Sequence, residues 1–224
     1  MQPYFFPYAG YFRLIAGVDR FVVFDTAQFL RRGWMHRNRI SDGTGGWSWI
    51  RASLRKAPRD TALADIELRE DIDWRGAVLD SLAVYSPRNH RYAPTRALVE
   101  RCLDVDTRSL ARLNVHALAL LSETLALDFE PLVLSRTSFD PGPSGDPQAR
   151  MLAIARALGA SEIVNLPGGR ALYDVAAFGC EGIRLSFIEA PAQAESGAVT
   201  GGVALSVVDD LMRTSPQAVG ARLG

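Results

Sequence analysis

The segment from Asp25 to Arg39 gathers side chains that could bind or act on a ligand. It holds four arginines, a histidine, an asparagine, a glutamine and an aspartate, directly after an apolar run. Guanidinium groups present paired donors that match the oxygens of phosphate and carboxylate groups. The segment therefore predicts a site for a negatively charged small molecule. The alternative is that several of these arginines only decorate a solvated loop.

A second candidate anion site is the segment from Pro167 to Arg170, between a predicted strand and a predicted helix. The backbone N–H groups of Gly168 and Gly169 could hold an anion there, with Asn165 close by. The alternative is a tight turn in which the glycines supply a positive φ. Two glycines alone do not decide between these interpretations.

Two further patterns favour structure over chemistry. Ser206 and Asp209 could form a catalytic pair, but a serine followed three residues later by an acid more often caps a helix. Cys102 and Cys180 are interpreted as small core residues, because no histidine motif accompanies either of them.

Composition limits the class of protein. The 224 residues fit a single domain, and 25 basic residues balance 25 acidic ones, so no global charge favours nucleic acid or an anionic membrane. Two cysteines and three histidines are scattered, so no metal site is expected. The sequence has no signal peptide and no apolar run of transmembrane length, and a cytoplasmic location is predicted.

The pattern of the first half predicts a strand followed by a helical section. Arg20 to Asp25 is an apolar run that ends in a carboxylate, as in a strand buried on both faces. Residues 46–54 and 64–69 alternate enough to form strands of a small antiparallel insertion within 46–70. Helices are expected at 73–85, 94–102 and 107–125, in a helical section over 73–126.

The second half alternates between strands and helices. Strands are expected at 131–135, 162–166 and 183–189, and helices at 146–159, 171–178 and 205–212. Such alternation predicts an α/β fold with a mainly parallel sheet flanked by helices. Residues 214–224 are expected to form a mobile tail.

Three motifs within forty residues resemble the N-terminal signature of the WbqC-like family. They are Gln-Pro-Tyr-Phe-Phe-Pro-Tyr-x-Gly-Tyr-Phe at 2–12, an acid and a glutamine at Asp25 and Gln28, and Trp-x-x-Arg-Asn-Arg-Ile at 34–40. The resemblance continues through the Gly168–Tyr173 loop and the Leu205–Leu211 segment, and so it covers most of the chain.

The chain departs from the family pattern at two places. Family members carry a short apolar strand before the Gln-Pro motif, whereas this chain starts at Met1-Gln2, so either the first strand is missing or the start of the chain was assigned late. His36 stands where the family is expected to have asparagine. A catalytic role for His36 is weakened by this difference.

The resemblance implies acyl or aminoacyl transfer onto an amino group of an activated sugar or a similar small amine, as in bacterial polysaccharide clusters. His36 or Asp25 would take the proton from the attacking amine. No cofactor would be tightly bound, and the co-substrate would be a thioester of coenzyme A or of an acyl carrier protein. The alternatives are a noncatalytic module that binds a nucleotide sugar or a carrier protein, and an ATP-dependent adenylate-forming ligase.

The same resemblance implies a binding crevice built from three segments: the first loop at 2–12, the segment 25–39 and the loop around Gly168. Arg31, Arg37 and Arg39 would bind phosphate, Gln28 and Asn38 would orient the substrate, and aromatic rings of the first loop would line a wall. The remaining predicted substrate-binding residues are Gln2, Tyr4, Phe6, Tyr8, Trp34, Asn165, Gly168, Gly169 and Tyr173.

A weaker likeness is to the nucleotidyltransferase-type α/β fold. There, a His-x-Gly-His motif that contacts phosphate follows the first strand, and Tyr8-Ala9-Gly10-Tyr11 stands at the corresponding place here. Because both histidines are replaced, adenylyl transfer by that machinery is not expected, although the scaffold could be retained.

Overall fold

A computed structural model describes residues 1–85, 89–143, 145–188, 199–200 and 202–223. The predicted strand 183–189 therefore ends outside the described residues. The element bounds below all refer to the described ranges.

Four parallel strands confirm the α/β class. β1 (Phe21–Val23) pairs with β4 (Pro131–Val133), and β5 (Glu162–Asn165) pairs with β6 (Arg184–Phe187). Among the described residues these are two separate two-stranded sheets, and not one continuous sheet. The backbone of Met1 lies along β1, because its amino group donates to Val22 O (2.6 Å) and its carbonyl accepts from Phe24 N (2.8 Å).

An antiparallel hairpin joins β2 (Arg37–Ser41) to β3 (Trp47–Arg51). β3 confirms the strand predicted within 46–54, whereas the strand predicted at 64–69 is wrong. That segment forms the 3-10 helix η1 (Leu63–Asp65) and then isolated bridges. It forms no continuous strand, because its backbone hydrogen bonds go in turn to two different segments of the chain. Arg69 N donates to Ser53 O, while Leu68 N donates to Arg108 O.

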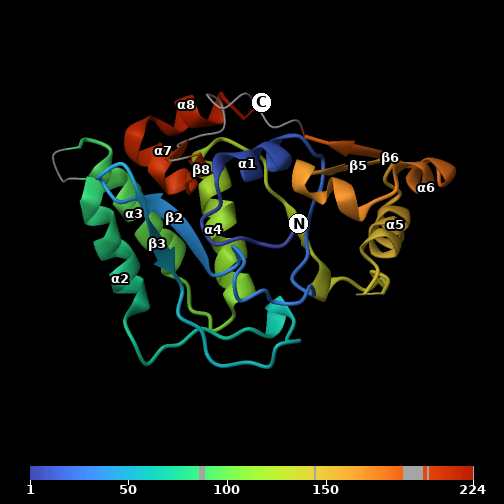
Figure 1. Cartoon of the computed structure of the whole chain (residues 1–224), viewed down its shortest axis with the longest axis horizontal. Coiled ribbons are helices and arrows are strands. Elements are labelled where there is room, and N and C mark those ends of the chain that lie inside the picture. The colour runs from blue at the N-terminus through green and yellow to red at the C-terminus, as the bar shows by residue number, and fades with distance from the viewer. Residues whose placement is uncertain (86–88, 144, 189–198, 201, 224) are drawn as a thin grey trace.

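The predicted helical section is confirmed. It comprises α2 (Trp74–Ser81), the 3-10 helix η2 (Leu82–Tyr85), α3 (Tyr92–Leu103) and α4 (Leu110–Thr124). α4 buries Leu110, Leu113, Ala117 and Leu121 on one stripe, as its 3.6-residue period requires. Figure 1 shows α4 in the middle of the molecule, with the β2–β3 hairpin, α2 and α3 on one side of it and β5, β6, α5 and α6 on the other.

The other elements complete the chain. They are α1 (Ala9–Ala16), η3 (Leu134–Arg136), α5 (Pro147–Leu158), η4 (Pro167–Leu172), α6 (Val175–Cys180), β7 (Val199–Thr200), β8 (Val203–Ala204), α7 (Val207–Arg213) and α8 (Pro216–Gly220). The caps predicted for α5 are confirmed: Asp146 accepts from Ala149 N, and Gly159 has a φ of 61°. The expected mobile tail instead contains α8, with Val219 and Leu223 buried.

Two hydrophobic clusters stabilise the fold. The larger one surrounds α4 and includes α1, the hairpin, the middle helices and α7. The smaller one lies between α5, β5, α6 and β6, around the fully buried Phe178. Cys102 belongs to the larger cluster, and burial raises the pKa of its thiol to about 12. Cys180 was predicted to be buried and is exposed.

No helix in the described ranges is both long and apolar enough to cross a membrane. In the same residues, no three His, Cys, Asp or Glu side chains are grouped as metal ligands.

Candidate functional site

The β2–β3 hairpin brings arginines and tryptophans onto one face. Its register pairs Arg37 with Arg51 and Arg39 with Trp49, and alternate residues of a strand project from the same face. Trp34 joins them from the turn before β2, since its ring centroid lies 5.9 Å from that of Trp49. We call this surface the Arg–Trp face, and its members are Trp34, Arg37, Arg39, Trp47, Trp49 and Arg51.

The turn of the hairpin fixes this register. Asp42 Oδ1 accepts hydrogen bonds from Thr44 N (2.8 Å), Thr44 Oγ1 (3.0 Å) and Gly46 N (2.9 Å). Gly43 and Gly45 have φ values of 79° and 97°, a region that a residue with a Cβ rarely adopts. The carboxylate and the two glycines therefore hold the two strands so that their arginines and tryptophans meet.

Cation–π contacts hold the Arg–Trp face together. The guanidinium carbon of Arg39 lies 4.4 Å from the ring centroid of Trp47, 4.8 Å from that of Trp34 and 5.0 Å from that of Trp49. Arg37 lies 4.3 Å from the Trp49 ring. Trp47 keeps 36% of its surface exposed. The face therefore offers planar rings and cations to a ligand at the same place.

The positive charge of this face is not balanced by a carboxylate of the described residues. Within the described part of the chain, Arg37, Arg39 and Arg51 form no ion pair with a carboxylate. Arg37 donates to Arg32 O (2.9 Å) and Gly33 O (3.4 Å), whereas Arg39 Nε is buried without a hydrogen-bond partner. Burial, and then the charge of Arg37, lowers the pKa of Arg39. An anion placed here would relieve this electrostatic repulsion.

His36 lies directly before β2, beside this face. Its backbone carbonyl accepts from Ala52 N (2.8 Å), and its ring packs edge-on against Phe29 with centroids 5.4 Å apart. Burial, followed by the charges of Arg37 and Arg51, lowers the pKa of His36 to about 4. The imidazole is therefore uncharged at neutral pH, and its buried Nδ1 has no hydrogen-bond partner.

Asp25 stands at the carboxyl end of β1, as predicted, but its carboxylate is engaged. Ser135 at the end of β4 donates both its backbone N–H (3.0 Å) and its hydroxyl to the Asp25 carboxylate. The neighbouring Thr26 hydroxyl accepts from Arg150 of α5. The structure describes no hydrogen bond between Asp25 and His36. Asp25 thus joins the ends of two parallel strands.

The first loop is held in place by the side chain of Asn38, which donates hydrogen bonds to backbone carbonyls of the loop. Asn38 donates to Phe5 O (3.2 Å) and Phe6 O (2.8 Å), and its own oxygen accepts from Arg39 N. Phe6 is fully buried, so it cannot form the pocket wall predicted for it. The carbonyl of Gln2 accepts from the Tyr11 hydroxyl (2.8 Å). Tyr4 and Tyr8 are half-buried beside the larger cluster.

The remaining predicted residues lie elsewhere. Gln28 and Arg31 are exposed and donate to Arg59 O (2.8 Å) and Ala57 O (2.6 Å), which ties their loop to the segment after β3. The loop with Asn165, Gly168, Gly169 and Tyr173 follows β5, on the opposite side of α4 from the hairpin (Figure 1). Tyr173 of this loop packs against the smaller hydrophobic cluster, and Leu166, just before the loop, packs against the larger one. That the three segments form one crevice stays a prediction.

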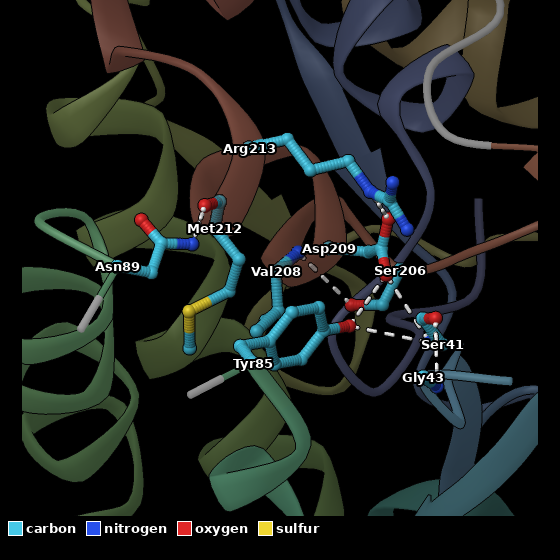
Figure 2. A network of polar contacts seen from close by, with 9 residues as sticks. All are labelled: Ser41, Gly43, Tyr85, Asn89, Ser206, Val208, Asp209, Met212 and Arg213. Atoms are coloured by element: carbon cyan, nitrogen blue, oxygen red, sulfur yellow. Dashed lines mark hydrogen bonds and ion pairs between the residues drawn. The ribbon is translucent and has the colours of Figure 1, made fainter. Parts of the chain in front are cut away.

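The Ser206–Asp209 motif acts as a structural junction. The Ser206 hydroxyl accepts from Val208 N (3.2 Å) at the start of α7, which confirms the predicted cap. Asp209, fully buried, accepts from the Tyr85 hydroxyl (2.5 Å), Ser41 N (3.1 Å) and Arg213 Nε (2.6 Å), as Figure 2 shows. Burial, and then the Asp209 carboxylate, raises the pKa of Tyr85, so this hydroxyl remains a donor.

Reasoning from the sequence missed Trp47, Trp49 and Arg51. All three belong to a stretch that was predicted as a strand, and they alternate with Ser48 and Ile50. The signal that could have found them is the Asp42–Gly46 turn between two alternating runs, which is typical of a hairpin.

The comparisons with known proteins cover almost the whole chain. The sequence profile described as the WbqC-like protein family matches residues 2–221. The uncharacterized protein Rv1507c of Mycobacterium tuberculosis (strain ATCC 25618 / H37Rv) is 26% identical over 221 residues, which cover 97% of this chain and 94% of that protein. No solved structure matches the chain.

Proposed function

Because the chain belongs to the WbqC-like protein family, we propose that it transfers an acyl or aminoacyl group onto the amino group of an activated sugar or a similar small amine. One observation supports this proposal above the others: the hairpin carries three arginines without carboxylate partners among the described residues, beside three tryptophans. This combination suits a nucleoside diphosphate, which has a planar base and two adjacent phosphates.

In this proposal the Arg–Trp face holds the acceptor. The base or the sugar of a nucleotide-linked amino sugar stacks on the exposed indole of Trp47, and Arg39 and Arg51 meet the diphosphate. Arg37 keeps Trp49 in place through its 4.3 Å contact and adds positive charge. Asn38 and Phe6 support the face from behind and do not contact the ligand.

The transfer forms one amide bond and breaks one thioester bond. The amine nitrogen attacks the carbonyl carbon of the donor, the C–S bond breaks, and the thiol of coenzyme A or of a carrier protein leaves. The nitrogen loses a proton during this step, and the thiolate gains one. Of the two predicted bases, His36 is the favoured proton acceptor, because the Asp25 carboxylate is already engaged by Ser135.

The test compares two arginine variants. Arg39→Ala should weaken the binding of UDP and dTDP, measured by isothermal titration calorimetry, by about tenfold or more, since a hydrogen bond to a charged group contributes roughly 1.5–3 kcal/mol. Arg112→Ala, an exposed arginine of α4, serves as the matched control and should bind like the unaltered protein. Equal affinities of the two variants would contradict the proposal.

A second readout separates an enzyme from a binding module. The protein is incubated with a nucleotide-linked amino sugar and a panel of acyl and aminoacyl thioesters, and the products are analysed by mass spectrometry. An amide product supports transfer. Nucleotide binding that depends on Arg39, without an amide from any thioester, would instead favour the binding module.

A further inference from the structure

A groove lies next to the Arg–Trp face, between β3 and α2. Its volume is about 390 Å³, and α2 packs along β3, whose other edge is paired with β2. Trp49 and Arg51 belong both to the groove and to the Arg–Trp face. The other lining residues include Ile50, Ile72, Trp74 and Val78. The groove therefore adjoins the Arg–Trp face.

The chemistry of the groove is apolar. Ile50, Trp74 and Val78 form a buried floor, and Ile72 keeps 41% of its surface exposed. Exposed large apolar side chains beside a preformed groove are typical of binding surfaces. Asp73 is the acid in the lining, and its carboxylate is occupied because it accepts from Gly76 N (2.7 Å) at the start of α2.

One lining residue of the groove has a buried donor. Trp74 is 4% exposed, and its indole Nε1 is buried with no hydrogen-bond acceptor among the described residues. A buried donor of this kind carries a free-energy cost that an acceptor oxygen would relieve. A carbonyl oxygen on an apolar chain provides such an acceptor.

We infer that this groove is the subsite for the acyl group of the donor thioester, and that it prefers an uncharged, apolar acyl chain. The inference rests on the proposed function, in which the Arg–Trp face holds the anionic acceptor. Because Trp49 and Arg51 line the groove and also belong to the Arg–Trp face, a donor in the groove would lie beside an acceptor held on the face.

The experiment uses neutral probes, so that binding to the groove is measured apart from binding to the arginines. The acetyl, butyryl and hexanoyl thioesters of N-acetylcysteamine are titrated into the full chain by calorimetry. Each methylene that is buried in the groove contributes a roughly constant amount of binding free energy. The affinity should therefore rise by about tenfold for every two carbons added to the acyl chain.

A matched pair of variants locates the binding. Ala77 is exposed on α2 and lines the groove, so Ala77→Phe should fill the groove and abolish the dependence on chain length. Ala83→Phe adds the same ring at an exposed alanine of η2 that does not line the groove, and it should keep that dependence. UDP binding should be unchanged in both variants.

The outcomes distinguish the two proposals. Thioester affinity that is flat along the series, or equal in Ala77→Phe and Ala83→Phe, overturns the groove inference even where UDP still binds through Arg39. Chain-length dependence that Ala77→Phe removes supports the groove, and it does so even where UDP fails to bind, in which case the proposed acceptor site is the part that is wrong.

Discussion

Asn38 and Arg39 are neighbours in β2 with opposite tasks. Asn38 points inward and donates to two carbonyls of the first loop, whereas Arg39 points outward among three indole rings. A strand makes this division unavoidable, because successive side chains lie on opposite faces. A substitution at Asn38 should therefore act through folding, and one at Arg39 through ligand binding.

His36 should make the stability of the protein depend on pH. Its pKa is about 4 in the folded protein and near 6.5 in an unfolded chain, so unfolding takes up a proton between these values. The contribution of the neutral imidazole is fully present above pH 6.5 and is lost as the pH falls towards 4. After allowance for solvent screening, the loss should be about 1 kcal/mol.

Urea unfolding at a series of pH values measures this effect. His36→Gln should flatten the decline of the free energy of unfolding between pH 6.5 and 4.5, whereas His116→Gln on α4 should follow the unaltered protein. An NMR titration that places the His36 pKa above 6 would contradict the expected environment.

For single residues, the chemistry of guanidinium groups was enough to predict from the sequence that Arg37 and Arg39 are candidates for binding an anion. It could not assign Asn38 to the first loop, because the partners of an amide depend on which backbone carbonyls the fold brings near it. Phe6 was misjudged for a related reason: aromatic residues serve equally well in a pocket wall and in a core, and only packing decides between them.

Elements distant in the sequence meet at Asp209. The carboxylate takes hydrogen bonds from β2 through Ser41, from η2 through Tyr85 and from α7 through Arg213 (Figure 2). The junction therefore fixes one end of the hairpin against two helical segments. Because β2 carries Arg37 and Arg39, the position of the Arg–Trp face depends on this buried carboxylate.

Asp209→Ala should destabilise the fold by about 3 kcal/mol, since it leaves the Tyr85 hydroxyl without its acceptor, removes one of the two acceptors of Ser41 N and removes the buried partner of Arg213. The midpoint of urea unfolding measures the loss. Asp19→Ala, at an exposed position, should change the free energy of unfolding by less than about 0.5 kcal/mol. A similar small change for Asp209→Ala would mean that the junction contributes little.

The helices were predictable as elements, because α4 has a regular apolar stripe and α5 has both caps written in its sequence. β2 was not predicted as a strand. Its arginines drew attention to ligand chemistry, while the alternation of Arg37, Asn38, Arg39 and Ile40 indicated a strand with one buried face. The segment 64–69 is the opposite case. Its alternation of apolar and polar residues predicted a strand, but the segment forms only isolated bridges to two neighbouring segments.

The whole molecule has two hydrophobic clusters of unequal size. The larger one carries the hairpin and the groove, and the smaller one carries the β5–α6–β6 unit with the Gly168 loop. Val164, Leu166 and Ile188 of this unit pack against the larger cluster and so connect the two. Local opening of the smaller cluster need not disturb the Arg–Trp face.

Phe178→Ala tests this separation. Removing the fully buried ring should cost about 3 kcal/mol and should speed amide hydrogen exchange in β5 and β6 more than in α4. Val175→Ala, at a side chain that is 56% exposed, is the control on the same helix. Exchange that accelerates equally in α4 would show that the two clusters open as one unit.

The way in which the strands and helices are assembled into the whole molecule was the hardest feature to predict from the sequence. The alternation of strands and helices correctly indicated parallel pairing, but local patterns do not state which parallel strands share a sheet. The predicted crevice joins segments from different pairs of strands for this reason: the Gly168 loop follows β5, which pairs with β6, whereas Arg37 to Arg39 belong to the β2–β3 hairpin.

The four tryptophans of the chain all lie on the Arg–Trp face or in the adjoining groove. Indole fluorescence of the unlabelled protein is therefore an optical signal from this region alone, and it is silent about the β5–β6 side. The ring centroids of Trp47 and Trp49 are 5.1 Å apart, close enough for their excited states to couple. A ligand that parts or stacks on these rings should change both the emission and the circular dichroism of the indoles, so the site contains its own spectroscopic probe.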